Sequence, residues 1–179
     1  MRGRPHRRAR PGAHVSEPMR VFVTGGTFDK EYDEIHGRLY FKDTHLPEML
    51  RLARCRLEVS LETLMMVDSL DMDQDGRRRV VESCRSCIEG RIVVTHGTDT
   101  MAETARALHA AALGKTVVLT GAMVPYAFGS SDGLFNLGSA LSFAQVLPPG
   151  VYVAMNGRAL RGDRVRKDRE TGIFHEGAA

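Results

Sequence analysis

The sequence has few cysteines and no long apolar run, and each shortage excludes a class of protein. Three cysteines among 179 residues form an odd set, which argues against a framework of disulfide bonds. No apolar segment is long enough to span a bilayer, and the N-terminus lacks the apolar stretch of a secretory signal. We therefore expect a cytoplasmic protein with no membrane partner.

Without its first 18 residues, the chain has no excess of positive charge. The formal net charge is +3, but residues 1–18 hold five arginines and a single acid, Glu17. The remaining chain carries 20 basic and 21 acidic residues, so no basic block there suggests nucleic acid as a partner. We expect 1–18 to be a disordered leader or tag, with a nucleic-acid arm or transit peptide as the alternative. Residues 19–179 are predicted to form a single domain.

Short β-branched apolar runs alternate with apolar residues at helical spacing. The predicted strands are Val21–Val23, Leu64–Val67, Ile92–Val94, Thr116–Leu119 and Val151–Met155. The helical stripes are Val80, Val81, Cys84, Cys87 and Ile88; Met101, Ala105, Leu108 and Ala112; and Leu134, Leu137, Leu141 and Ala144. Strands apolar on both faces that alternate with helices predict a doubly wound α/β domain, Rossmann-like or flavodoxin-like. Its mostly parallel sheet is expected to have helices on both faces.

Three predicted strands end alike, in VFVTGGT, IVVTHGT and VVLTGAM. Ligands of open parallel sheets bind at the carboxyl ends of the strands, and glycine there lets backbone N–H groups approach a ligand. The three turns therefore predict one polar pocket, rich in hydroxyls and hydrogen-bond donors, at this edge of the sheet. TGGTFDK does not fit a dinucleotide site, because the G-x-G-x-x-G spacing is absent.

Two motifs that could hold a metal have a simpler structural interpretation. Residues 71–82, DMDQDGRRRVVE, match a calcium loop, but a strand precedes them where an EF-hand needs a helix. Asp73 or Asp75 is expected to cap the following helix instead. Cys84 and Cys87 lie on a predicted apolar stripe and are expected to be buried core residues. We predict no metal and no cofactor.

The remaining signal is a group of hydroxyls beside a carboxylate. A nucleophilic hydroxyl needs a sharp turn to present it and a group to take its proton. Thr27 follows two glycines, and Thr98 follows Gly97 with Asp99 beside it. Of the four lysines, Lys167 is the one that we expect to fold back to this edge. Burial would lower the pKa of its ammonium while a neighbouring Asp would raise it, and the sequence leaves that balance open.

Five segments, in order, resemble the bacterial-type L-asparaginases: TGGTF, SLDMD, VVTHGTDTMAETA, VVLTGAMVPYAFGSSDGLFNL and VAMNGRALRGDRVRK. From the first segment to the last, the resemblance spans essentially all of residues 20–170. The resemblance implies hydrolysis of L-asparagine to L-aspartate and ammonia without a metal or cofactor. Two alternatives stay open: a glutaminase or an ammonia-supplying subunit of a tRNA amidotransferase, and an amino-acid sensor without turnover.

The resemblance also implies roles for individual residues. Thr27 matches the nucleophile that forms an acyl-enzyme, and Thr98, Asp99 and Lys167 match a second group that acts on the attacking water. Asp99 would hold the substrate ammonium and Ser69 its carboxylate. The remaining pocket residues that the resemblance implies are Gly26, Gly97, Thr98 and Ala122. A loop tyrosine supports the nucleophile in this family; Tyr32 and Tyr40 both qualify, and we favour Tyr32, which is nearer in sequence.

The match departs from the family pattern at two places. Leu70 stands where the family has a glutamine that binds the substrate backbone, so weaker binding or a changed preference between asparagine and glutamine is expected. The chain ends near the family's N-terminal domain boundary, so we expect a short form without the usual C-terminal domain. Its uncovered surfaces favour a homo-oligomer.

Overall fold

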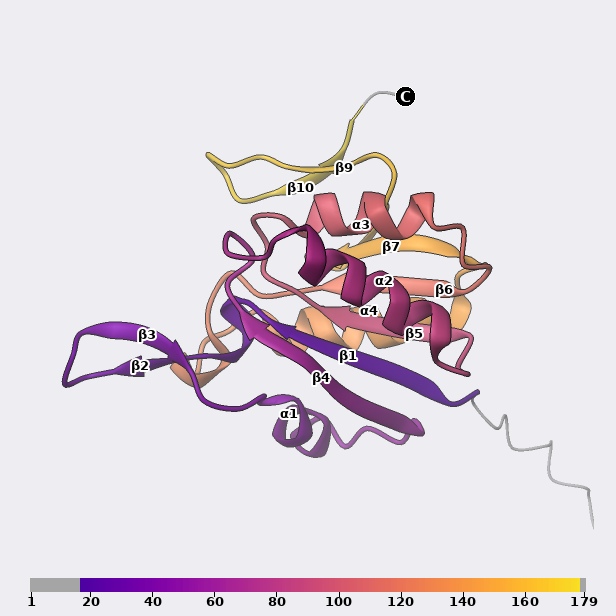
Figure 1. Ribbon diagram of the computed structural model, residues 1–179. Helices are drawn as coiled ribbons and strands as arrows, with labels where there is room; N and C mark the ends of the chain where they lie inside the picture. Colours follow the sequence, from indigo (N-terminus) through magenta and orange to yellow (C-terminus); the bar gives the residue numbers. More distant parts are fainter. Residues whose placement is uncertain (1–16, 178–179) are drawn as a thin grey trace, which may run out of the picture.

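The computed structural model describes residues 17–177, and its centre is a six-stranded sheet of order β4-β1-β5-β6-β7-β8 (Figure 1). All neighbours from β4 to β7 are parallel, whereas β8 pairs antiparallel with β7. This confirms the mostly parallel sheet. In sheet order the strands are β4 (Val59–Val67), β1 (Met19–Gly25), β5 (Arg91–Thr95), β6 (Thr116–Thr120), β7 (Gly150–Met155) and β8 (Arg158–Arg161).

Helices cover both faces of the sheet, as a doubly wound fold requires. On one face, α2 (Gln74–Ser86) and α3 (Met101–Ala110) pack on Ile92 and Val94 of β5. On the other, α1 (Leu46–Leu52) and α4 (Gly133–Val146) share a cluster with Val93. Successive strand side chains point to opposite faces, so these three fully buried residues serve two cores. Burying each contributes about 1.5–3 kcal/mol.

Two small hairpins stand outside the main sheet. β2 (Lys30–Asp33) and β3 (Arg38–Phe41) follow the 3-10 turn η1 (Thr27–Asp29) and project from the body of the molecule (Figure 1). β9 (Val165–Lys167) pairs antiparallel with β10 (Phe174–Glu176). Arg106 of α3 ties this second hairpin down by donating to the Val165 carbonyl at 3.3 Å. A second 3-10 turn, η2 (Tyr126–Phe128), precedes α4.

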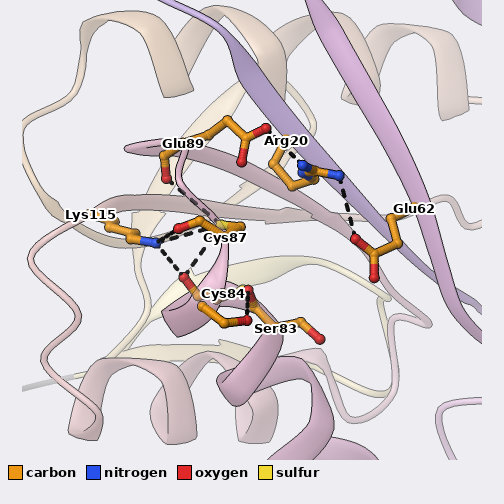
Figure 2. A network of polar contacts seen from close by, with 8 residues as sticks. Arg20, Glu62, Ser83, Cys84, Cys87, Glu89 and Lys115 are labelled. Atoms are coloured by element: carbon orange, nitrogen blue, oxygen red, sulfur yellow. Dashed lines mark hydrogen bonds and ion pairs between the residues drawn. The ribbon is translucent and has the colours of Figure 1, made fainter.

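The end of α2 corrects one predicted apolar stripe. Cys84 is fully buried as expected, but Cys87 is the extended C-cap and only half-buried, and Ile88 is 95% exposed. The ammonium of Lys115 explains the stop, because it donates to the Cys84 carbonyl at 2.9 Å and also to the Cys87 carbonyl (Figure 2). A cation there satisfies carbonyls that a helix terminus leaves without partners.

The other helix and strand limits also differ from the sequence pattern. Ala112 lies beyond α3 with a φ of 46°, so it leaves the stripe on which it was predicted. Leu134, in the first turn of α4, is 39% exposed and does not belong to the core. β4 begins at Val59, earlier than the predicted run from Leu64, because its first residues alternate between half-buried and exposed positions.

Residues at both ends of the chain lie outside the described range 17–177. The predicted leader at 1–18 lies outside the described residues up to position 16. Among the helices formed within 17–177, none has the length and apolar character needed to cross a membrane.

Candidate functional site

The three threonine- and glycine-bearing turns meet at one edge of the sheet. β1 and β6 both pair in parallel with β5, so their carboxyl ends lie together. Gly26 has a φ of 78°, and a β-carbon there would lie 2.3 Å from the Gly97 nitrogen. A β-carbon on Gly121 would lie 2.4 Å from the His96 carbonyl oxygen. These short distances leave no room for a side chain at either glycine. They show that the turn after β1 and the turn after β6 both pack against the turn after β5.

Ser69 lies against the second turn. A β-carbon at Gly97 would be 2.6 Å from the Ser69 β-carbon and 2.7 Å from its hydroxyl oxygen. The hydroxyl of Thr100 donates to the Ser69 carbonyl at 2.7 Å and fixes the two turns together. Ser69 is buried, yet its own hydroxyl has no hydrogen-bond partner within 17–177. A buried hydroxyl of this kind is suited to receive a polar ligand group.

Thr27 begins η1 directly after Gly26, and the two residues that follow anchor its turn. Phe28 is fully buried in the core shared with α1 and α4. Asp29 is also buried and accepts hydrogen bonds from the Thr44 hydroxyl at 3.0 Å and the His45 backbone at 2.9 Å. Burial raises the pKa of the Asp29 carboxyl, although those two bonds partly oppose the shift. The half-buried Thr27 side chain is thus held on a rigid support.

Lys167 joins the second turn from the distant strand β9. Its ammonium donates to the Thr98 hydroxyl at 2.8 Å and to the Asp99 carboxylate at 2.6 Å. The lysine side chain is 10% exposed and that of Asp99 is 40% exposed, so the pair lies at the border of solvent. The sequence predicted this approach of Lys167 to the edge of the sheet, and the geometry confirms it.

His96 is inside the fold and is not available as a catalytic base. Its Nδ1 lies 2.7 Å from the Gly97 carbonyl oxygen, and its Nε2 lies 2.8 Å from the Thr104 hydroxyl. Complete burial lowers the pKa of this imidazole to about 4, so it is neutral near pH 7. The ring supports the Gly97 turn from beneath.

The two candidate tyrosines point to opposite faces of the β2–β3 hairpin. Tyr40 is paired with Glu31 and donates to its carboxylate at 2.9 Å, which raises the pKa of the phenol. Tyr32 is 55% exposed and shares its face of the strand with Lys30. The Lys30 ammonium pairs with Asp68, which immediately precedes Ser69. The Tyr32 hydroxyl instead lies near the hairpin turn, 4.0 Å from where a β-carbon on Gly37 would be.

The pair of Lys30 and Asp68 was not anticipated from the sequence. Burial disfavours the Asp68 carboxylate, but bonds from Lys30 and the Leu70 backbone outweigh it and hold its pKa below the usual range. Lys30 lies only three residues after Thr27, which is the signal that could have drawn attention to it.

Two other predicted residues take less direct positions. Ala122 is fully buried in the core on the α4 side, so only its backbone is available to a ligand. Leu70 is 66% exposed at the strand end where the family pattern has an amide.

The calcium-loop motif folds as a helix start. Asp73 caps α2 by accepting a hydrogen bond from the Gly76 backbone at 2.8 Å, as predicted for Asp73 or Asp75. Within the part of the chain that the structure describes, no group of three or more His, Cys, Asp or Glu side chains could hold a metal ion.

The domain is doubly wound and has a threonine after each of two strands. One of these threonines is bound by a lysine and followed by an aspartate. Together these features define an asparaginase-like α/β protein. The chain belongs to the family described as Asparaginase, N-terminal, whose model matches residues 19–173.

Relatives of two kinds share this domain. The chain is 34% identical over 163 residues to L-asparaginase 1 of Escherichia coli K12, covering 86% of this chain and 48% of the relative. It is 34% identical over 187 residues to one component of the glutamyl-tRNA(Gln) amidotransferase of Aeropyrum pernix, covering 88% and 43%. The thermostable L-asparaginase from Thermococcus kodakarensis superposes with a TM-score of 0.79 at 30% identity, covering 89% and 51%. The chain thus spans about half the length of these relatives.

Proposed function

We propose that this protein hydrolyses the side-chain amide of L-asparagine to L-aspartate and ammonia. The observation that carries the proposal is the Lys167 ammonium, which donates to both Thr98 and Asp99 at the edge where Gly26, Gly97 and Ser69 meet. Membership of the asparaginase family and the similarity to proteins named L-asparaginase support the choice of substrate.

In the proposed first step, the Thr27 hydroxyl oxygen attacks the amide carbon of the substrate. The C–N bond breaks, the hydroxyl proton leaves with the nitrogen as ammonia, and an aspartyl ester forms on Thr27. In the second step water attacks that ester, the C–O bond to Thr27 breaks, and aspartate is released with the hydroxyl restored. Splitting the reaction at a covalent ester replaces one difficult step by two easier ones.

The second group would act on the water and on the substrate backbone. Lys167 fixes the Thr98 hydroxyl, which we expect to position the attacking water. The exposed part of the Asp99 carboxylate is free to accept from the α-ammonium, and the unpartnered Ser69 hydroxyl would donate to the α-carboxylate. Each charged hydrogen bond of this kind contributes about 1.5–3 kcal/mol to substrate binding.

Tyr32 is our proposed support for the nucleophile. It follows Thr27 by five residues and shares a strand face with Lys30, which is bound next to Ser69. We also propose that the protein works in the cytoplasm, in keeping with three cysteines that are all free thiols.

The test is ammonia release from L-asparagine and L-glutamine by the purified full chain. Thr27→Ala is expected to lose more than about 10³-fold in rate, the scale on which removal of a nucleophile acts. Thr63→Ala, on an exposed face of β4, is the matched control and should keep the wild-type rate. Full activity in Thr27→Ala would contradict the proposed mechanism.

The same assay separates the alternatives. Similarity to an amidotransferase component keeps glutamine hydrolysis for a coupled acceptor as a second candidate. Ammonia from glutamine in clear preference to asparagine would favour that candidate. Binding of asparagine without any ammonia release would favour a sensor.

A further inference from the structure

A cleft adjoins the site on its Lys167 side. Its volume is about 720 Å³, and it lies between α3 and the segment 163–169. Asp99 and Lys167 form part of its wall, whereas Thr27, Ser69 and Thr98 do not line it. The lining is rich in basic side chains, namely Arg106, Arg164, Arg166, Lys167 and Arg169.

Each acidic side chain of this cleft already has a cation of its own. Asp99 is bound by Lys167, and Glu103 accepts from Arg77 at 2.7 Å. Asp163 accepts from Arg161 at 3.2 Å and has Arg164 at 3.8 Å. The negative charge of the lining is therefore compensated within the protein.

Three arginines remain without compensation. Within 17–177, Arg106, Arg166 and Arg169 have no carboxylate within ion-pair distance, and Arg106 uses one N–H on the Val165 carbonyl. Guanidinium groups present N–H donors in a planar fork that fits carboxylate and phosphate oxygens. These three exposed guanidinium groups on one concave surface create a positive field that favours an anionic ligand.

We propose that this cleft binds a small polyanion bearing phosphate or carboxylate groups, held by Arg106, Arg166 and Arg169. A volume of about 720 Å³ suits a small molecule with several charged groups. It is concave and local, unlike the extended basic stripe that a nucleic acid needs, and the domain as a whole is close to neutral.

Occupancy has a consequence for the neighbouring site. Lys167 faces both the cleft and the pair of Thr98 and Asp99, so an anion in the cleft would compete for its ammonium protons. Ammonia release should then fall as the anion saturates. This consequence rests on the proposed function, whereas binding itself does not.

The test is isothermal titration calorimetry of the full chain with inorganic pyrophosphate and, separately, citrate, at constant ionic strength. One variant combines Arg106→Gln, Arg166→Gln and Arg169→Gln. Its matched control combines Arg51→Gln, Arg79→Gln and Arg158→Gln, three exposed arginines that also lack a carboxylate partner in the described region. Both triple variants remove three positive charges. The single variant Arg169→Gln keeps the test informative if the cleft triple variant does not fold.

We expect one probe or both to bind with 1:1 stoichiometry. The cleft triple should lose about tenfold or more in affinity, the control triple less than about twofold, and Arg169→Gln an intermediate amount. Pyrophosphate alone would assign the phosphate class, and citrate alone the carboxylate class. Single-stranded RNA and anionic vesicles are titrated in the same way for comparison. Three results would overturn the proposal: no heat with either small probe at millimolar concentration, equal losses in both triples, or binding only to the RNA or the vesicles. Calorimetry measures binding directly. If the protein proved to have no amidase activity, the proposal of an anion-binding cleft would therefore still hold.

Discussion

At the scale of single residues, one lysine links parts of the chain that are far apart in sequence. Lys167 comes from β9 and reaches Thr98 and Asp99, nearly seventy positions earlier. Asp99 is 40% exposed, so water screens the ion pair and its contribution to stability is small. The pair therefore matters for what it positions more than for the stability of the fold.

Lys167→Met is predicted to separate catalysis from stability. Without the ammonium, Thr98 loses its donor, so ammonia release should fall by about 10²–10⁴-fold, the usual contribution of a positioned proton-transfer group. The thermal midpoint should change little. Lys42→Met, at an exposed position, is the control and should behave as the wild type in both measurements. An unchanged rate in Lys167→Met would remove this lysine from the mechanism.

The buried, neutral His96 should make the stability of the fold depend on pH. Its pKa is about 4 in the fold and about 6.5 in the unfolded chain, so the unfolded state binds the proton first as pH falls. The free energy of unfolding should drop between pH 6.5 and pH 4, by about 1.4 kcal/mol per pH unit from this group.

His96→Gln keeps a hydrogen-bonding side chain but cannot titrate. Urea unfolding of both proteins from pH 7 to pH 4 should therefore show a shallower loss in the variant. Equal slopes in the two proteins would mean that His96 is not the buried neutral group described.

At the scale of elements, the β2–β3 hairpin places the two candidate tyrosines on opposite faces. Glu31 and Tyr40 bond to each other on one face, with the His45 ring 3.8 Å from Glu31. Lys30 and Tyr32 lie on the other face, where Lys30 reaches Asp68. The alternation of a strand thus gives the two tyrosines different surroundings.

Tyr32→Phe and Tyr40→Phe are a matched pair that removes one hydroxyl from each face. We expect Tyr32→Phe to lower kcat for asparagine by about 10²-fold, the lower end for a proton-transfer group. Tyr40→Phe should keep kcat within a few-fold, because it loses only a solvent-exposed bond to Glu31. Steady-state kinetics that showed the reverse order would transfer the supporting role to Tyr40.

The sequence predicted the strands of the main sheet better than the hairpins. The central strand is predictable from its sequence because both of its faces are buried and apolar, at Ile92, Val93 and Val94. The β2–β3 hairpin has charged side chains at four of its eight strand positions and none of the eight is buried, so its apolar residues show no alternation to detect. Lys30 and Asp68 meet only through tertiary folding, across 38 positions, which no local pattern encodes.

At the scale of the whole molecule, exposed apolar side chains support the proposed self-association. Phe128, Phe135 and Ile173 are large and at least half exposed, around and on α4 and in the β9–β10 loop. Exposed apolar residues that form one patch commonly mark an interface with another chain, which is the expectation tested next.

Light scattering coupled to size-exclusion chromatography should give a mass at least twice the 19.8 kDa of one chain. Phe135→Glu, which places a charge on the exposed face of α4, should lower that mass, whereas Leu52→Glu on the exposed side of α1 should not. A single-chain mass at micromolar and higher concentrations would contradict the proposed homo-oligomer.

The central claim is that Thr27 carries the acyl group during turnover. The most direct measurement is peptide mapping by mass spectrometry of enzyme quenched with acid while it hydrolyses asparagine. We predict an aspartyl ester on the peptide that contains Thr27, and no ester in Thr27→Ala. An ester on the peptide that contains Thr98, with full ammonia release by Thr27→Ala, would contradict this assignment.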